Sequence, residues 1–192
     1  MNGARVSVID IKTGNGLMQS LLEVIQPETK NDLVGKLLSD TAFTLFTQAL
    51  QHSGLLSTLK TGEYTLLAPH NVALRSKGTI QPGINLSSSA DILATDPATL
   101  AELLKYHILP GRYFLDGIHR AAKATGDASV TTLQGAKIMI GGNIDTYNST
   151  TFRGRQNTST AGIYRVLNER HNFANQPAGN GVVHGINQVL IP

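Results

Sequence analysis

The chain has 192 residues, 41% of them hydrophobic and 15% charged, and its net charge is +3. This size and apolar content predict one domain with a substantial core, or one domain with a fragment of another. The absence of cysteine excludes disulfides, thiol catalysis and cysteine-ligated metals; the small net charge gives no support for nucleic-acid binding, and no apolar run reaches the roughly 18 residues of a membrane-spanning helix.

Residues 3–27 are predicted to form a β-hairpin. Residues 5–11 alternate between polar and apolar, residues 13–16 provide an Asn-Gly turn, and residues 17–25 form the returning strand. An isolated hairpin is at best marginally stable in water. We therefore expect it to pair with a neighbouring sheet edge, in this chain or in another, and self-association through the hairpin is one form of that pairing.

A helical pattern starts at residue 31, and strands are expected in the second half. The first helix has Asn31 or Asp32 as its cap. The predicted elements are helices over 31–38 and 40–53, a short turn over 55–59, a strand over 64–68, a short helix capped by Asn71, a helix from the Asp96-Pro97 start signal to residue 107, and strands over 112–115, 130–133, 136–140, 163–167 and 182–191.

Two segments are predicted to be irregular. Residues 76–96 are rich in Ser and Gly and are expected to form a surface excursion with one helical turn near residues 90–93. Residues 141–161 are rich in Asn, Thr and Gly and are expected to form an elongated loop. Helices grouped early and strands grouped late predict an α+β fold with antiparallel pairing.

An internal repeat relates the two ends of the chain. Residues 178–192 match residues 13–27 without a gap, at a constant offset of 165 positions (178 minus 13). The Gly-Asn-Gly turn is identical in the two copies, most apolar positions are kept, and His184 stands opposite Gln19. A match of this kind indicates two copies of one structural unit, so we interpret each segment as the end of a domain.

Three blocks of the sequence resemble those of a known family, in the same order. They are residues 64–74 (YTLLAPHNVAL) with Thr65, Pro69 and Asn71, residues 103–111 (LLKYHILPG) with Tyr106 and His107, and residues 180–192 (NGVVHGINQVLIP) with Asn180, Gly181 and His184. Together they are similar to the fasciclin-like (fasciclin I-type) adhesion domain. Leu67 and Leu74 stand where that family prefers Phe, and His70 stands where it prefers Thr.

The resemblance implies a fold and a domain organisation. The fold is an α+β, wedge-shaped β-sandwich with helices packed at its N-terminal side. Residues 28–192 would be a nearly complete fasciclin-like domain, and residues 1–27 would be the closing hairpin of a preceding domain with its linker. The resemblance also implies an extracellular or cell-surface protein, secreted or anchored as a lipoprotein, whose domains occur in tandem.

The function implied is non-enzymatic adhesion or recognition of a protein or glycan, without a cofactor or metal. A neighbouring fasciclin-like domain is a further expected partner. The candidate binding residues are Tyr106 and His107, which the family associates with integrin-type adhesion, and Asn148, Arg153 and Arg155 in the segment 141–161. Loops on a rigid scaffold usually carry specificity, so the segments 76–96 and 141–161 are expected to form the binding surface.

Other interpretations stay open at the level of the sequence. His107 can be a buried histidine bonded to the backbone, and the basic residues of the second half can be solvated surface charge or can contact an anionic glycan. The domain can be a structural spacer in a tandem array. A hydrolase or metal-dependent enzyme using His107 and His184 requires both imidazoles to meet in an open cleft, although the six histidines show no metal-binding spacing.

Overall fold

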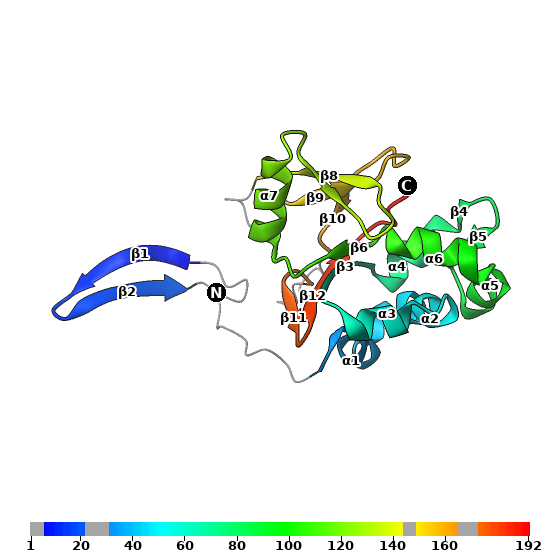
Figure 1. The fold of residues 1–192 in the computed structure, drawn as a ribbon, viewed down its shortest axis with the longest axis horizontal. Helices are drawn as coiled ribbons and strands as arrows, with labels where there is room; N and C mark the ends of the chain where they lie inside the picture. Colours follow the sequence, from blue (N-terminus) through cyan, green and yellow to red (C-terminus); the bar gives the residue numbers. More distant parts are fainter. Residues whose placement is uncertain (1–5, 22–30, 144–148, 165–172) are drawn as a thin grey trace.

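A computed structural model describes residues 6–21, 31–143, 149–164 and 173–192 (Figure 1). The helices are α1 (Leu33–Ser39), the 3-10 helix η1 (Thr41–Phe43), α2 (Thr44–His52), α3 (Leu55–Thr61), α4 (Asn71–Lys77), α5 (Ser89–Ala94), α6 (Pro97–Lys105) and α7 (Leu115–Ala124). The strands are β1 (Val6–Thr13), β2 (Gly16–Leu21), β3 (Tyr64–Pro69), β4 (Thr79–Gln81), β5 (Ile84–Asn85), β6 (Ile108–Pro110), β7 (Ser129–Thr131), β8 (Lys137–Gly141), β9 (Thr151–Arg153), β10 (Ala161–Gly162), β11 (Gln176–Ala178) and β12 (Gly181–Ile186).

The central sheet has the strand order β11-β12-β3-β6. Its two inner strands are parallel, with Gly181 beside Tyr64 and Ile186 beside Pro69. The remaining pairs of this sheet are antiparallel. The α+β class is confirmed, whereas the expectation of antiparallel pairing is wrong for the pair β3–β12. That pair joins the first and third of the blocks that carry the family resemblance.

A second sheet, of order β10-β9-β8-β7, closes against the central one at both ends. At one end Ile163 forms a β-bridge with Ile186. At the other end the Leu133 N–H donates to the Ile108 carbonyl at 2.7 Å. The two sheets therefore form a sandwich, and the helices α1–α6 lie on the far face of the central sheet (Figure 1).

The central sheet is buried on both faces, which is why its strands are almost continuously apolar. Successive side chains of a strand point to opposite faces. Accordingly Leu66 and Ala68 pack against the helices, while Leu67 between them packs in the core of the sandwich with Phe152 and Ile138. The strands β3, β6 and β12, which carry the three blocks of the family resemblance, thus each contribute side chains to the helical core and to the core of the sandwich.

Helix start signals are confirmed at two of the predicted sites. The Asp32 carboxylate accepts from the Gly35 N–H at 2.7 Å, and the Asp96 carboxylate accepts from the Thr99 N–H at 2.8 Å. The α4 cap differs from expectation, because the His70 imidazole accepts from the Val72 N–H.

Asn71, the predicted cap of α4, instead connects that helix to the start of α2. Its amide oxygen accepts from the Leu45 N–H at 3.0 Å, and its amide nitrogen donates to the Thr41 carbonyl and to the Thr44 hydroxyl. Asn71 therefore cross-links two helices that are distant in sequence.

The two segments predicted to be irregular contain regular structure and core residues. Within 76–96 lie β4, β5 and α5, and Ile80, Ile84, Leu86 and Ile92 are buried in the helical core. The segment is thus anchored in the core by these four side chains, while about half of its residues are exposed at the surface. The described part of 141–161 contains β9 and the first residue of β10, with Phe152 buried.

Two further helices were not expected. The predicted turn at 55–59 is the helix α3, and the predicted strand at 112–115 is a coil that leads into α7. Leu115, Ile118 and Ala122 form the buried face of α7, at spacings of three and four residues. Because Gly117 and polar residues lie between them, only these three positions mark the helix in the sequence.

Asn180 connects the closing hairpin to the helical layer. Its amide oxygen accepts from the Leu33 N–H at 2.8 Å, and its amide nitrogen donates to the carbonyls of Leu59 and Gly62 at 2.7 and 3.0 Å. One side chain thereby satisfies a free N–H at the start of α1 and free carbonyls at the end of α3.

Replacing Asn180 with alanine is expected to lower the free energy of unfolding by about 3 kcal/mol, because three hydrogen bonds worth about 1 kcal/mol each are lost. Urea denaturation followed by circular dichroism measures this change. The matched control is Asn15→Ala, at the equivalent but exposed position of the repeat, which should change the free energy by less than about 0.5 kcal/mol. Equal midpoints for the two variants would contradict the role given to Asn180.

Candidate functional site

Tyr106 lies under a surface loop and is fully buried. Its hydroxyl donates to the Lys137 carbonyl at 2.8 Å and accepts from the Arg155 N–H at 3.2 Å. Burial raises the pKa of this hydroxyl, which stays protonated and keeps its donor role. The side chain therefore does not form part of the outer surface but holds residue 155 from below.

The loop above it, residues 153–160, is held to residues 187–191 and is here named the basic loop. The buried Asn157 donates to the Val189 carbonyl at 2.9 Å and accepts from the Ile191 N–H at 2.7 Å. Gly154 lies so close to Ile191 that a Cβ atom there would overlap its backbone. Arg153, the last residue of β9, and Arg155 are both exposed, and the Arg153 Nε donates to the Asn157 carbonyl at 3.3 Å. Two cations thus stand on a backbone anchored from two sides.

His107 fixes the same C-terminal segment from inside the core. Its Nε2 accepts from the Leu190 N–H at 2.9 Å, so the proton is on Nδ1, which donates to the Leu103 carbonyl at 3.1 Å. Complete burial lowers the pKa of the imidazole to about 4, and the ring is neutral at pH 7. Both ring nitrogens are bound to the main chain, leaving none for a substrate or metal.

His184 fixes the coil before α7 through hydrogen bonds to the main chain. Its Nδ1 accepts from the Asn175 N–H at 3.0 Å, and its protonated Nε2 donates to the Tyr113 carbonyl at 3.0 Å. Burial lowers the pKa of this imidazole as well, to about 4. The Thr65 hydroxyl binds the same coil, accepting from the Tyr113 N–H and donating to the Gly111 carbonyl, both at 2.8 Å.

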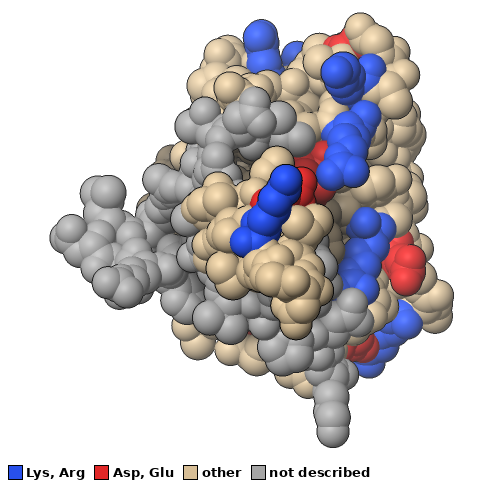
Figure 2. Space-filling model, turned by 90° about the vertical axis from the view of Figure 1, so that its left-hand side faces the viewer, with Lys and Arg blue, Asp and Glu red and all other residues tan. Residues whose placement is uncertain are grey.

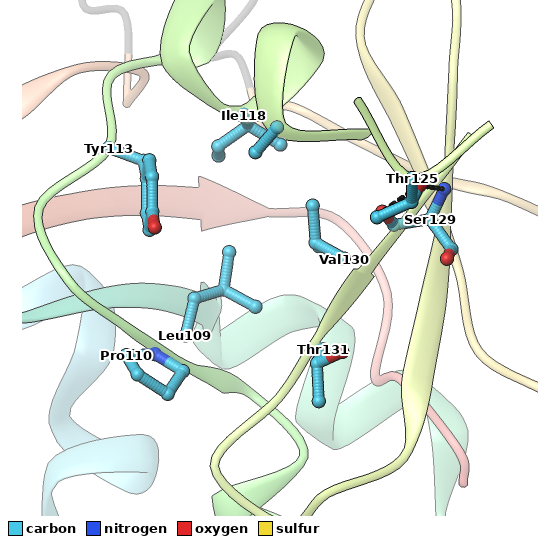
Figure 3. A pocket seen from close by; sticks show the side chains of 9 residues that line it. Leu109, Pro110, Tyr113, Ile118, Thr125, Ser129, Val130 and Thr131 are labelled. Atoms are coloured by element: carbon cyan, nitrogen blue, oxygen red, sulfur yellow. Dashed lines mark hydrogen bonds between the residues drawn. The ribbon is translucent and has the colours of Figure 1, made fainter. Parts of the chain in front are cut away.

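That coil forms one wall of an apolar pocket of about 280 Å³. Figure 3 shows Leu109, Ile118 and Val130 turned toward the same space, with Tyr113 at its side. The pocket lies between β6, α7 and β7. Among its polar lining residues, Thr125 and Ser129 bond to each other: the Ser129 N–H donates to the Thr125 hydroxyl, which donates to the Ser129 carbonyl.

On the face shown in Figure 2 the basic residues do not form one continuous patch. Figure 2 shows Lys and Arg side chains spread over one face, with Asp and Glu side chains beside several of them. Arg120 pairs with Asp116, and Lys137 pairs with Asp127, each at 2.7 Å. Lys137 also lowers the pKa of Asp127, together with hydrogen bonds from Ser129 and Thr125.

The predicted site residues thus separate into two groups. Tyr106, His107, Thr65 and His184 lie inside and position loops through backbone hydrogen bonds, while Arg153 and Arg155 lie on the surface. Asn148 lies outside the described residues. Asn157 was not predicted: it appears in the sequence only as one of several Asn-x-Ser/Thr motifs, and no local pattern distinguishes it.

The arrangement does not support the alternative of a hydrolase or metal site built on His107 and His184. Each imidazole is enclosed and has both nitrogens bound to backbone atoms. Within the described residues no three His, Cys, Asp or Glu side chains are grouped as metal ligands would be.

Among the helices that the structure describes, none has the length and apolarity to cross a membrane.

Residues 41–192 match the family model of the fasciclin domain. The chain belongs to the fasciclin family. Its fold is similar to the solved structure of a fasciclin (FAS1) domain pair from the insect cell adhesion molecule fasciclin I, with a TM-score of 0.63, 16% identity, and coverage of 100% of this chain and 61% of that one. The predicted family and fold are therefore confirmed.

Sequence relatives agree with this assignment. Human periostin is 27% identical over 169 residues, covering 86% of this chain, and the transforming growth factor-beta-induced protein ig-h3 of Sus scrofa is 30% identical over 195 residues, covering the whole chain. The chain spans only 19% and 24% of the lengths of these two proteins. Fasciclin domains are non-enzymatic, and membership of the family confirms the expectation that the chain is not an enzyme.

Replacing Tyr106 with phenylalanine is expected to lower the free energy of unfolding by about 1–3 kcal/mol, because the Arg155 N–H and the Lys137 carbonyl lose a buried partner. Hydrogen exchange should also quicken at the Arg155 amide. Tyr113→Phe, at the rim of the apolar pocket, is the control for loss of a tyrosine hydroxyl. Unchanged exchange at Arg155 would show that Tyr106 does not hold the basic loop.

Proposed function

We propose that this fasciclin domain is an extracellular or cell-surface adhesion module that binds a protein or a glycan without catalysis, using the basic loop. The observation that carries the proposal is that the exposed side chains of Arg153 and Arg155 stand on a loop held by the buried side chains of Tyr106 and Asn157. The cell adhesion molecule with the same fold and the periostin and ig-h3 relatives support this class of function.

A preformed loop favours recognition because little conformational entropy remains to be lost on binding. Guanidinium groups suit this role, since their planar donors match carboxylate and sulfate oxygens in bidentate geometry. The expected partner surface is therefore anionic. The segment 76–96, which we also expected to contribute, carries exposed residues around its four buried apolar ones, and binding there stays a prediction.

Removing both guanidinium groups tests the proposal. The wild-type protein, screened on arrays of sulfated glycans and of secreted proteins, should give hits whose signal falls as salt is raised from about 0.05 to 0.5 M. Arg153→Ala with Arg155→Ala should reduce those signals at least about tenfold. Arg120→Ala is the matched control, because it removes a guanidinium from α7 and leaves the loop intact.

The second candidate function is a structural spacer in a tandem array, favoured by the repeat that relates the two hairpins. A spacer would show no array signal above background from a folded sample. Signals that persist in the double variant at full strength would place binding elsewhere on the domain and contradict the role of the basic loop.

A further inference from the structure

The hairpin β1–β2 reproduces the closing hairpin β11–β12 in the limits of its second strand and in the register of the three residue pairs next to the turn. Adding the repeat offset of 165 to the limits of β2, 16 and 21, yields those of β12, 181 and 186. The paired residues also correspond: Thr13–Gly16 with Ala178–Gly181, Lys12–Leu17 with Pro177–Val182, and Ile11–Met18 with Gln176–Val183. The likeness to the solved domain pair also extends over the whole chain, hairpin included.

The correspondence includes an irregular feature of the backbone. Asp10 has a φ of 55°, and Asn175, 165 positions later, has a φ of 53°, although few residues other than glycine adopt this conformation. In both places the side chain opposite accepts from the N–H of that residue: Gln19 from Asp10 at 3.4 Å, and His184 from Asn175 at 3.0 Å. The two hairpins are therefore two copies of one structural element.

The two copies differ in what covers them. All six residues of β12 are buried. The strand lies between β11 and β3, pairs in parallel with β3, and has its two faces in the two cores. In the hairpin, Leu17 and Met18 are 62% and 52% exposed, and the sheet contains only β1 and β2. Figure 1 shows the hairpin extending away from the rest of the molecule.

We propose that β2 docks in parallel beside the β3 strand of another fasciclin domain, one without a closing hairpin of its own, and completes the central sheet of that domain. A second copy of this chain does not offer the site, because its own β12 already occupies β3. The acceptor presents the free helix-end groups that Asn180 binds here, and Asn15 is placed to bind them.

Docking also requires Gly16. At the equivalent Gly181 a Cβ atom would overlap the Tyr64 carbonyl oxygen and approach Leu33 Cδ1 to 2.7 Å, whereas a Cβ on Gly16 meets nothing within 4 Å in this structure. Gly16 therefore serves no steric purpose in the free hairpin. In the docked state it allows the same close approach of two backbones.

A tandem polypeptide tests the proposal with the hairpin and the domain that follows it both intact. Residues 28–170 are placed directly before residues 6–192, so that the hairpin follows an upstream copy that lacks β11 and β12. In the matched control, residues 28–192 precede residues 6–192, and the upstream copy keeps its own closing hairpin. Hydrogen exchange is measured at the β2 amides in both tandems and in the 192-residue chain.

We expect exchange at β2 to slow by at least about 100-fold in the first tandem only. Gly16→Ala should abolish that protection and unfold the upstream copy, and should leave the 192-residue chain unchanged. Rapid exchange at β2 in the first tandem, with a folded upstream copy in the control, would overturn the proposal. Protection in the 192-residue chain with dimers in sedimentation would overturn it too, since the hairpin would then pair with itself.

Discussion

Replacing Gly181 with alanine is expected to destabilise the domain by about 3 kcal/mol or more, which for a chain of this size corresponds to a fall of about 10 °C in Tm. The added Cβ would overlap the Tyr64 carbonyl oxygen across the parallel pair, and Leu33 closes the other side. Gly181 and Tyr64 form the first pair of the two inner strands, and with Leu33 on the other side the backbone cannot move aside unless the pair β3–β12 separates at this end.

Gly16→Ala is the matched control, because it makes the same substitution at the equivalent position of the exposed hairpin. Its expected effect on the thermal midpoint of the chain is less than about 1 °C, since the new Cβ meets open space. Thermal unfolding followed by circular dichroism measures both variants. A Gly181→Ala protein as stable as Gly16→Ala would mean that β12 does not lie against β3.

Acidification is expected to unfold the domain through His107 and His184. Burial lowers both pKa values from 6.5 to about 4, so between these values the unfolded chain binds up to two more protons than the native one. The contribution of the neutral imidazoles is therefore complete above pH 6.5 and is lost as pH falls toward 4. The free energy of unfolding should drop by up to about 2.7 kcal/mol per pH unit in this interval.

Urea denaturation at pH 7.5, 5.5 and 4.5 measures that slope. His184→Gln should roughly halve it, and glutamine is the residue that stands at the equivalent position of the repeat, where Gln19 accepts from the corresponding N–H. His107→Gln should also roughly halve the slope, because it removes the other buried imidazole. A slope that neither substitution reduces would assign the acid sensitivity to other groups.

The parts of the fold that depend on neighbouring residues could be predicted from the sequence. Asp32 and Asp96 cap helices because a short side chain with an acceptor oxygen, placed just before a helix, reaches the free N–H groups of the first turn. The strand at 64–69 is visible in the sequence as an apolar run that ends at a proline. The helix α7 was also visible in principle, since Leu115, Ile118 and Ala122 follow helical spacing.

The positioning network could not be predicted, because its partners are backbone atoms distant in sequence. Nothing in the residues around His107 identifies the Leu190 N–H as its partner, and nothing around Asn157 identifies residues 189–191. The repeat did carry one useful signal. Because glutamine stands at the equivalent position of the repeat, the repeat favours a structural role for the His184 imidazole, and the geometry of His184 agrees with that role.

The parallel pair β3–β12 has a consequence for synthesis on the ribosome. Gly181 is added 117 positions after its partner Tyr64 (181 minus 64), which at typical elongation rates takes on the order of ten seconds. During that interval β3 is already made but one of its edges stays open, and open edges recruit foreign strands. The nascent chain therefore passes through an interval in which β3 exists without the strand β12 that will cover this edge.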